Sequence, residues 1–256
     1  MRYSAHKTWG GGMEEGAQIA TRVWDLPVRL FHWVLVLLLA FQVVTGRIGG
    51  SLMPYHAYCG YAVLVLVVFR ILWGFAGSTH ARFASFLAGP VATGRFAARL
   101  FSRKAVPQVG HNPLGGWMVV ALIACLGLQA ASGLFANDGA SAQGPLASRV
   151  ALETSNLLTE FHRWNLKALL VLSGVHIAGV FFHWLVKGEN LIGAMFTGMK
   201  NVPEVALRER RDALRKSPRR RAASREHASA YFATGTRALI LFIASLLIVA
   251  VVVRGF

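Results

Sequence analysis

Residues 160–187 read EFHRWNLKALLVLSGVHIAGVFFHWLVK, an apolar run that is long enough to cross a bilayer as a helix. Three histidines interrupt it, and two of them, His162 and His176, are fourteen positions apart. Fourteen positions make almost four helical turns, so these two imidazoles share one face and lie about 21 Å apart along the axis. The run therefore predicts one imidazole near each side of a membrane.

The composition of the whole chain agrees with a membrane protein. Of its 256 residues, 55% are hydrophobic and only 15% are charged, which is unusual for a soluble domain. Five windows are long and apolar enough to span: residues 30–46, 56–76, 113–136, 164–186 and 238–253. The last is the weakest, because only sixteen uncharged residues separate Arg237 from Arg254. We expect an all-α integral membrane fold, a four-helix transmembrane bundle with a fifth C-terminal transmembrane helix.

The formal net charge of +16 has a topological meaning. The basic residues are segregated by loop instead of covering a domain surface, which argues against a nucleic-acid partner. The connection after the second window is basic and has no acid, whereas residues 137–160 hold three acids and the single basic residue Arg149. The positive-inside rule then places the N-terminus and the connection between windows two and three in the cytoplasm. Residues 137–160 are expected outside.

Four segments are expected along the chain. They are a polar N-terminal extension (1–21), the membrane domain (22–200), a basic cytoplasmic linker on the lipid surface (201–230) and the last helix (231–256). No internal repeat is evident. Cys59 and Cys125 fall at different depths and are expected to be unbridged packing residues. The absence of C-x-x-C-H excludes the usual covalent attachment of a c-type haem.

The histidines match in depth as pairs. His56 and His162 open windows two and four on the outer side, while His32 and His176 lie toward the cytoplasm. Ionisable residues inside a membrane normally face the bundle interior and have a partner. The pairs His56–His162 and His32–His176 therefore suggest two stacked haems with bis-histidine ligation. Such ligation leaves no open coordination position, which favours electron transfer over oxygen chemistry.

His183 is an alternative to His176 as the inner ligand. It lies seven residues further on, still on the same face, so geometry alone permits either residue to face His32. We prefer His176, because position 183 is one turn from Lys187 and close to the headgroups. His183 would then be an interfacial histidine or a proton-exchanging group beside a quinone. His80 and His111 are interpreted as interfacial histidines.

Haem propionates need cations, and several basic residues fall at suitable depths. Arg70 is fourteen residues after His56 and Arg29 is one turn before His32, so both are candidates for the inner haem. The candidates for the outer haem are Arg47, Arg163 and Lys167. Positive residues at the ends of spans are also ordinary interface anchors, so each assignment has that alternative.

Small residues are the second requirement of a flat macrocycle. Gly60 and Gly174 lie near His56 and His176 and would leave room for one. The third window has no histidine but many small residues, so we expect it to act as a packing wall. These residues are Gly115, Gly116, Gly127, Ala130, Ala131 and Gly133.

Four strings carry a family resemblance. They are VWDLPVRLFHW (23–33), HAYCGY (56–61), FHRWN (161–165) and HWLVKGENLIGAMFTGMK (183–200). Together they resemble the bacterial cytochrome b561 and Ni,Fe-hydrogenase b-type cytochrome family, which is related to the gamma subunits of formate dehydrogenases. The resemblance covers residues 22–200. It implies a four-helix bundle with two b haems held from the first, second and fourth helices, and it supports ligand roles for His32, His56, His162 and His176.

The resemblance also implies a function in the bacterial inner membrane. We expect electron transfer between the quinone pool and a periplasmic c-type cytochrome, dehydrogenase or hydrogenase, with a second copy of the chain as a further candidate partner. By analogy, a quinone would bind near the inner haem, beside His32, His176, His183 and Arg70. One alternative is a self-contained quinone reductase fed by a small outer donor such as superoxide. A cofactor-free anchor or permease is disfavoured, because no span contains an acidic residue for ion coupling.

Overall fold

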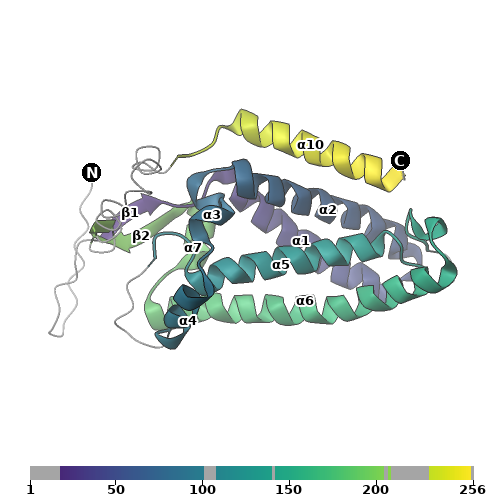
Figure 1. Ribbon diagram of the computed structural model, residues 1–256, viewed down its shortest axis with the longest axis horizontal. Coiled ribbons are helices and arrows are strands. Elements are labelled where there is room, and N and C mark those ends of the chain that lie inside the picture. Colours follow the sequence, from purple (N-terminus) through teal and green to yellow (C-terminus); the bar gives the residue numbers. More distant parts are fainter. Residues whose placement is uncertain (1–17, 101–107, 140–141, 205–206, 209–230, 255–256) are drawn as a thin grey trace.

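The computed structural model describes residues 18–100, 108–139, 142–204, 207–208 and 231–254. Five of its helices are long and apolar enough to cross a membrane, which confirms the five expected spans by length and composition. They are α1 (Leu26–Ile48), α2 (Met53–Ala76), α5 (Pro113–Gly133), α6 (Leu152–Lys187) and α10 (Gly235–Arg254). Helices α1, α2, α5 and α6 form a bundle, and α10 lies along its side next to α2 (Figure 1).

The short elements gather at the two ends of the bundle. One end, here called the sheet end, carries β1 (Gln18–Arg22), β2 (Met199–Pro203), α3 (Phe83–Phe86), α4 (Pro90–Ala98) and α7 (Leu191–Thr197) (Figure 1). A 3-10 turn, η2 (Thr79–Ala81), leads from α2 into α3. The opposite end, the loop end, holds the α1–α2 turn with η1 (Gly50–Leu52) and the α5–α6 connection with η3 (Ala147–Arg149).

A two-stranded antiparallel sheet joins the segments on either side of the membrane domain. The register runs from Gln18 opposite Pro203 to Arg22 opposite Met199. Val23 and Val202, both essentially inaccessible to solvent, form a small core beneath it. The strands therefore lie across the expected segment boundaries at 21/22 and 200/201. The linker residues 209–230 lie outside the described part of the chain.

The bundle core is apolar and centred on α2. Val63 and Val67 of α2 pack against Cys125 and Leu126 of α5 and against Leu169 of α6. The outward faces are also apolar, with large hydrophobic side chains left exposed on α1, α6 and α10. Helices that are apolar on both sides suit a bilayer, because lipid replaces water as the outer solvent. Both cysteines of the chain, Cys59 and Cys125, are free.

Helix α10 is docked, although its sequence window is the weakest of the five. The Phe242 ring lies 6.0 Å from that of Phe69 on α2, and Ser245 is fully buried. The segment that leads into α10 is tied down at the sheet end. There the Tyr231 carbonyl accepts from the Thr79 amide at 3.0 Å, and the Tyr231 amide donates to the Thr79 hydroxyl at 2.9 Å.

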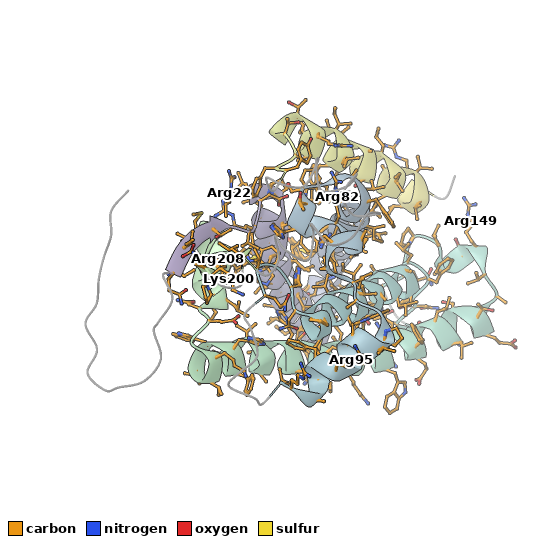
Figure 2. All side chains as sticks on the ribbon, turned by 60° about the vertical axis from the view of Figure 1, so that its left-hand side comes forward. Arg22, Arg82, Arg95, Arg149, Lys200 and Arg208 are labelled. Carbon is orange, nitrogen blue, oxygen red and sulfur yellow. The ribbon has the colours of Figure 1, made fainter. Side chains whose placement is uncertain are left out.

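Charge differs between the two ends. Figure 2 shows Arg22, Arg82, Lys200 and Arg208 toward the sheet end, with Arg149 at the opposite end. This is the asymmetry that the positive-inside rule associates with a cytoplasmic sheet end. Orientation in the membrane stays a prediction.

Asp25 connects three elements at the sheet end. Its Oδ1 caps α1 by accepting from the Val28 amide at 2.8 Å, and its Oδ2 accepts from the indole N–H of Trp73 at 3.0 Å. Asp25 is buried and Trp73 is completely inaccessible. The carboxylate also interacts electrostatically with the buried guanidinium of Arg70. The Asp25 carboxylate thus accepts from the first turn of α1 and from the Trp73 indole, and it also lies near the positive charge of Arg70.

Asp25→Ala is expected to lower the free energy of unfolding by roughly 2–4 kcal/mol, because it removes an N-cap and leaves a buried indole N–H without an acceptor. Asp25→Asn keeps a capping oxygen and should cost less. Thermal unfolding of the two variants in detergent micelles checks this order. Equal unfolding temperatures for Asp25→Ala and the unaltered protein would contradict it.

Candidate functional site

A cavity of about 390 Å³ lies between α1, α2, α5 and α6 at the loop end. His56 of α2 and His162 of α6 both line it, and their ring centroids are 6.3 Å apart with an interplanar angle of 74°. Two imidazoles that bind the same metal ion from opposite sides, each at about 2 Å, have ring centroids about 6 Å apart. The structure therefore brings these two predicted ligands to the separation that shared coordination needs.

The tautomers of both imidazoles follow from their neighbours. Nδ1 of His56 lies 3.2 Å from the backbone carbonyl of Gln42, and Nδ1 of His162 lies 2.9 Å from that of Gln129. A carbonyl oxygen only accepts, so each Nδ1 carries the proton and donates it. Each Nε2 is then left with its lone pair, which is the state in which histidine binds a metal.

Two glycines on neighbouring helices leave room for the two imidazole rings. A Cβ at Gly46 would come within 2.9 Å of the His56 ring, and a Cβ at Gly133 within 3.0 Å of the His162 ring. The lining is mainly apolar and includes Leu39, Leu126 and Leu166. The volume of the cavity, its mainly apolar lining and the two available Nε2 atoms together fit a b haem held between His56 and His162.

Cations border the same cavity. Arg47 and Arg163, two of the expected propionate partners, are among its lining residues. Lys167, the third, is exposed and holds its ammonium 3.6 Å from the ring centroid of Trp164. The structure therefore brings two of the three outer cations to the cavity and leaves Lys167 outside its lining.

The second pair of histidines lies nearer the sheet end. The imidazoles of His32 on α1 and His176 on α6 are close enough to interact electrostatically. Nδ1 of His32 is buried and has no hydrogen-bond partner among the described residues. A second metal-centred group at this pair stays a prediction.

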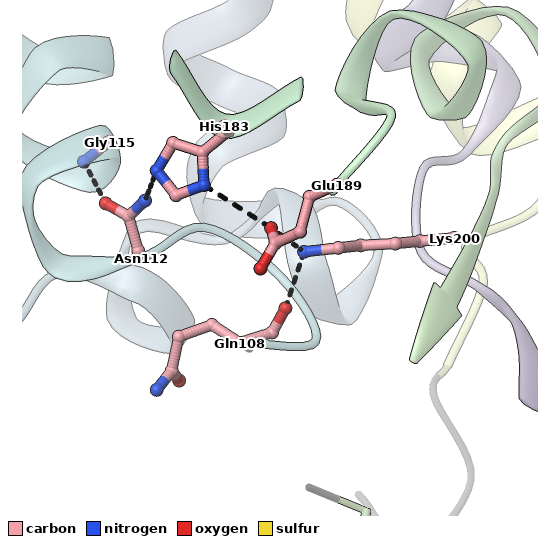
Figure 3. Close-up of polar contacts among 6 residues, drawn as sticks. All are labelled: Gln108, Asn112, Gly115, His183, Glu189 and Lys200. Atoms are coloured by element: carbon pink, nitrogen blue, oxygen red, sulfur yellow. Dashed lines mark hydrogen bonds and ion pairs between the residues drawn. The ribbon is translucent and has the colours of Figure 1, made fainter. Parts of the chain in front are cut away.

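Two other side chains, Asn112 and Glu189, contact the imidazole of His183 (Figure 3). The Asn112 Oδ1 accepts from the Gly115 amide at 2.7 Å, which turns the amide nitrogen of Asn112 toward His183. That nitrogen only donates, so Nε2 of His183, 3.1 Å away, accepts. Nδ1 then carries the proton and faces the Glu189 carboxylate at 3.5 Å. With Nε2 hydrogen-bonded to Asn112 and Nδ1 in an ion-pair contact with Glu189, His183 is less suited than His176 to bind iron.

Glu189 is the centre of this network. Besides His183 it receives the Lys200 ammonium at 3.0 Å, and Lys200 also donates to the Gln108 carbonyl at 2.8 Å (Figure 3). Burial alone would raise the pKa of the Glu189 carboxyl, but the hydrogen bond from His183 and the charge of Lys200 hold its pKa below the ordinary value. The network ties the end of α6 to β2 and to the segment before α5.

Glu189→Gln is expected to lower stability by roughly 1–3 kcal/mol at neutral pH, since it removes the charged partner of two donors. A carboxyl whose pKa falls on folding stabilises the protein above its unfolded pKa, and this stabilisation is lost as pH falls through the folded pKa. The difference between Glu189→Gln and the unaltered protein should therefore shrink on acidification. Unfolding temperatures measured from neutral to acidic pH test this, and a constant difference would contradict it.

Arg70 and Arg29 lie at the sheet end. The guanidinium of Arg70 donates to the Ala81 carbonyl at 3.2 Å and lies 5.4 Å from the Phe83 ring centroid. Arg29 donates to the carbonyl of Phe196 on α7. Both retain further N–H groups, so their assignment as propionate partners stays a prediction.

The structure corrects the interpretation of His80 and His111 as interfacial histidines. His111 packs between the rings of Trp24 and Phe86, with centroids 4.5 and 4.7 Å away, and His80 is buried. Burial, together with nearby positive groups of which Arg70 contributes most, lowers the pKa of His111 to about 3. His111 is therefore neutral at physiological pH. No local sequence signal separates these two from loop histidines, because distant residues bury them.

Comparison with known proteins gives consistent similarity to one family. The family described as prokaryotic cytochrome b561 matches residues 23–198. Similar proteins include probable Ni/Fe-hydrogenase B-type cytochrome subunits of Azotobacter chroococcum (31% identity, 41% of this chain and 55% of the relative) and Cupriavidus necator (33%, 41% and 53%). The chain thus spans about half the length of these two relatives. The corresponding protein of Bradyrhizobium diazoefficiens is 26% identical over 69% of this chain and 84% of its own. No solved structure matches.

Proposed function

Because this chain belongs to the prokaryotic cytochrome b561 family, we propose that it is a membrane electron-transfer subunit with two b haems. His56 and His162 hold one haem near the loop end, and His32 and His176 hold the other nearer the sheet end. The sheet end faces the cytoplasm of a bacterial inner membrane, and the loop end faces the periplasm.

One observation carries this proposal most directly. Two imidazoles from separate helices face each other across an apolar cavity with ring centroids 6.3 Å apart. Backbone carbonyls fix the proton of each on Nδ1. An ordinary packing pair of histidines needs neither this separation nor two matching tautomers.

The residues of the chain have three tasks in this function. The four histidines fix two levels in the bundle, and α6 supplies a ligand at each level about 21 Å apart. Apolar side chains around the cavity exclude water, and the arginines at its rim offer donors to propionates. A bound b haem supplies reversible one-electron transfer, and bis-histidine ligation keeps oxygen from the iron.

The names of the relatives support a first choice of partner. Those named above are probable Ni/Fe-hydrogenase subunits, so a hydrogenase at the periplasmic face is the first partner to test, with a c-type cytochrome or another dehydrogenase as alternatives. A quinone at the inner level, near His176 and Arg70, would complete the path. Reduction of the haems by hydrogen in the presence of a matching hydrogenase tests the partner. Quinone reduction without any protein donor would instead support a self-contained enzyme.

The haem content of the purified full-length chain tests the core of the proposal. We expect a reduced-minus-oxidised spectrum of b type, with roughly two haems per chain and a low-spin ferric signal, as bis-imidazole ligation requires. Well-folded protein without bound haem would reject the proposal.

A further inference from the structure

A five-residue pattern, Gln-x-x-Thr/Ser-Gly, occurs twice in the membrane domain. It covers residues 42–46 near the end of α1 and residues 129–133 at the end of α5. Each pattern precedes the helix that carries an outer histidine, since α1 leads into α2 with His56 and α5 leads into α6 with His162. Because only these few positions agree, the two segments do not stand out as an internal repeat in the sequence. The structure gives the two segments the same relation to a histidine.

The first segment, here called the α1 cradle (Gln42, Thr45 and Gly46), contacts His56 at three points. Nδ1 of His56 lies 3.2 Å from the Gln42 carbonyl and 3.2 Å from the Thr45 hydroxyl. That hydroxyl donates at 2.9 Å to the Phe41 carbonyl of its own helix, so its lone pairs are left to accept from the imidazole. Gly46 lets the ring approach, because a Cβ there would lie 2.9 Å from Cε1 of His56.

The second segment, the α5 cradle (Gln129, Ser132 and Gly133), repeats this arrangement around His162. Nδ1 of His162 lies 2.9 Å from the Gln129 carbonyl and 3.2 Å from the Ser132 hydroxyl. Ser132 donates at 3.0 Å to the same Gln129 carbonyl, which again leaves its oxygen to accept. A Cβ at Gly133 would lie 3.0 Å from Cε1 of His162. Helix α5, the third expected span, therefore does more than pack against its neighbours, which was the role expected from its small residues.

We infer that the α1 and α5 cradles are a duplicated positioning device, which fixes the tautomer and ring plane of both outer haem ligands and lowers the reduction potential of that haem. The inference rests on the proposed function. A carbonyl and a hydroxyl that both accept from Nδ1–H make the imidazole a more basic ligand, and more basic ligands stabilise the oxidised metal. At the inner level, Nδ1 of His32 has no acceptor among the described residues. We therefore expect the two haems to differ in reduction potential, with the outer haem the lower of the two.

The glycines provide the first test. Gly46→Ala and Gly133→Ala each push a methyl group into an imidazole that cannot retreat without losing its acceptors. We expect each variant to lose the outer haem, so that haem per chain falls from roughly two toward one, or to keep this haem without its low-spin signal. Gly127→Ala is the matched control on α5, because its Cβ would meet only a methyl of Val67 at an ordinary 3.7 Å. The inner haem, retained in all three variants, reports that the bundle is folded.

The hydroxyls provide a test that leaves the ring in place. Thr45→Val and Ser132→Ala remove one acceptor each and should raise the potential of one haem. The expected change is threefold to tenfold in its reduction equilibrium, up to about 59 mV for a one-electron couple. Thr45→Ser and Ser132→Thr keep the hydroxyl and should restore the original potential. Ser245→Ala is the control, since this buried serine makes a comparable bond to Leu241 on α10.

The outcomes separate the two proposals. If the unaltered chain binds no haem, the proposed function fails. If it binds haem but Gly46→Ala and Gly133→Ala match Gly127→Ala in content and spectrum, the cradles do not position the ligands. If Thr45→Val and Ser132→Ala leave both midpoint potentials unchanged, or shift the potential of the inner haem instead, the proposed tuning of the outer haem is overturned.

Discussion

His162→Ala should reduce the haem content of the purified chain from roughly two to roughly one, because it removes one of two opposed ligands at the loop end. The loss should be nearly complete, since His56 and His162 are the only histidines that line the cavity within the described part of the chain. The remaining haem should keep its low-spin spectrum, because its proposed ligands are His32 on α1 and His176, which lies about 21 Å further along α6. His56→Ala should give the same result, as both variants disable one site.

Haem extraction, reduced-minus-oxidised spectra and ferric electron paramagnetic resonance measure this effect. Leu166→Ala is a suitable control, because Leu166 lines the same cavity and the change removes volume but no ligand. His162→Gly with added free imidazole offers a rescue, in which the small molecule replaces the missing side chain. Full haem content in both His162→Ala and His56→Ala would show that the outer pair does not bind the cofactor.

His176→Ala and His183→Ala should differ sharply. The first is expected to lose the inner haem, so that haem per chain again falls from roughly two to roughly one. The second should keep both haems, because Asn112 donates to Nε2 of His183 and the Glu189 carboxylate lies 3.5 Å from its Nδ1. Its expected cost is in stability, by roughly 1–3 kcal/mol, since it leaves the Asn112 amide and Glu189 without one partner each.

The same pair of variants also tests the alternative left open by the spacing of the two residues. Haem content and unfolding temperature are measured together on each protein, with Glu189→Gln as a control that weakens the same network without touching a histidine. Retention of both haems in His176→Ala, with loss of one in His183→Ala, would transfer the inner ligand to position 183.

Much of the architecture follows from local sequence. Apolar windows predict spans because a bilayer imposes length and lack of charge on each helix separately. The depths of His56 and His162 follow from their places in those windows, and the structure brings the two rings together at the cavity. The resemblance to the family, carried by strings such as FHRWN, agrees with the match over residues 23–198.

Other features depend on which helices are neighbours, and no single segment records that. The Gln42 and Gln129 carbonyls are backbone atoms, so their role toward histidine leaves no mark in side-chain composition. The pairing of β1 with β2 joins two five-residue strands that are remote in the chain and too short to stand out. The polar first turns of α6 extend the helix well beyond the apolar window, because contacts at the loop end support them.

Helix α6 runs without a break for 36 residues, about 54 Å, and has no proline. It carries both His162 and His176, so the distance between the two proposed redox centres is set by one rigid helix. Bilayers of different thickness are accommodated chiefly by tilting such a helix or by local deformation of the lipid. The conducting distance should consequently stay constant from one lipid mixture to another, while the angle of the protein to the membrane normal varies.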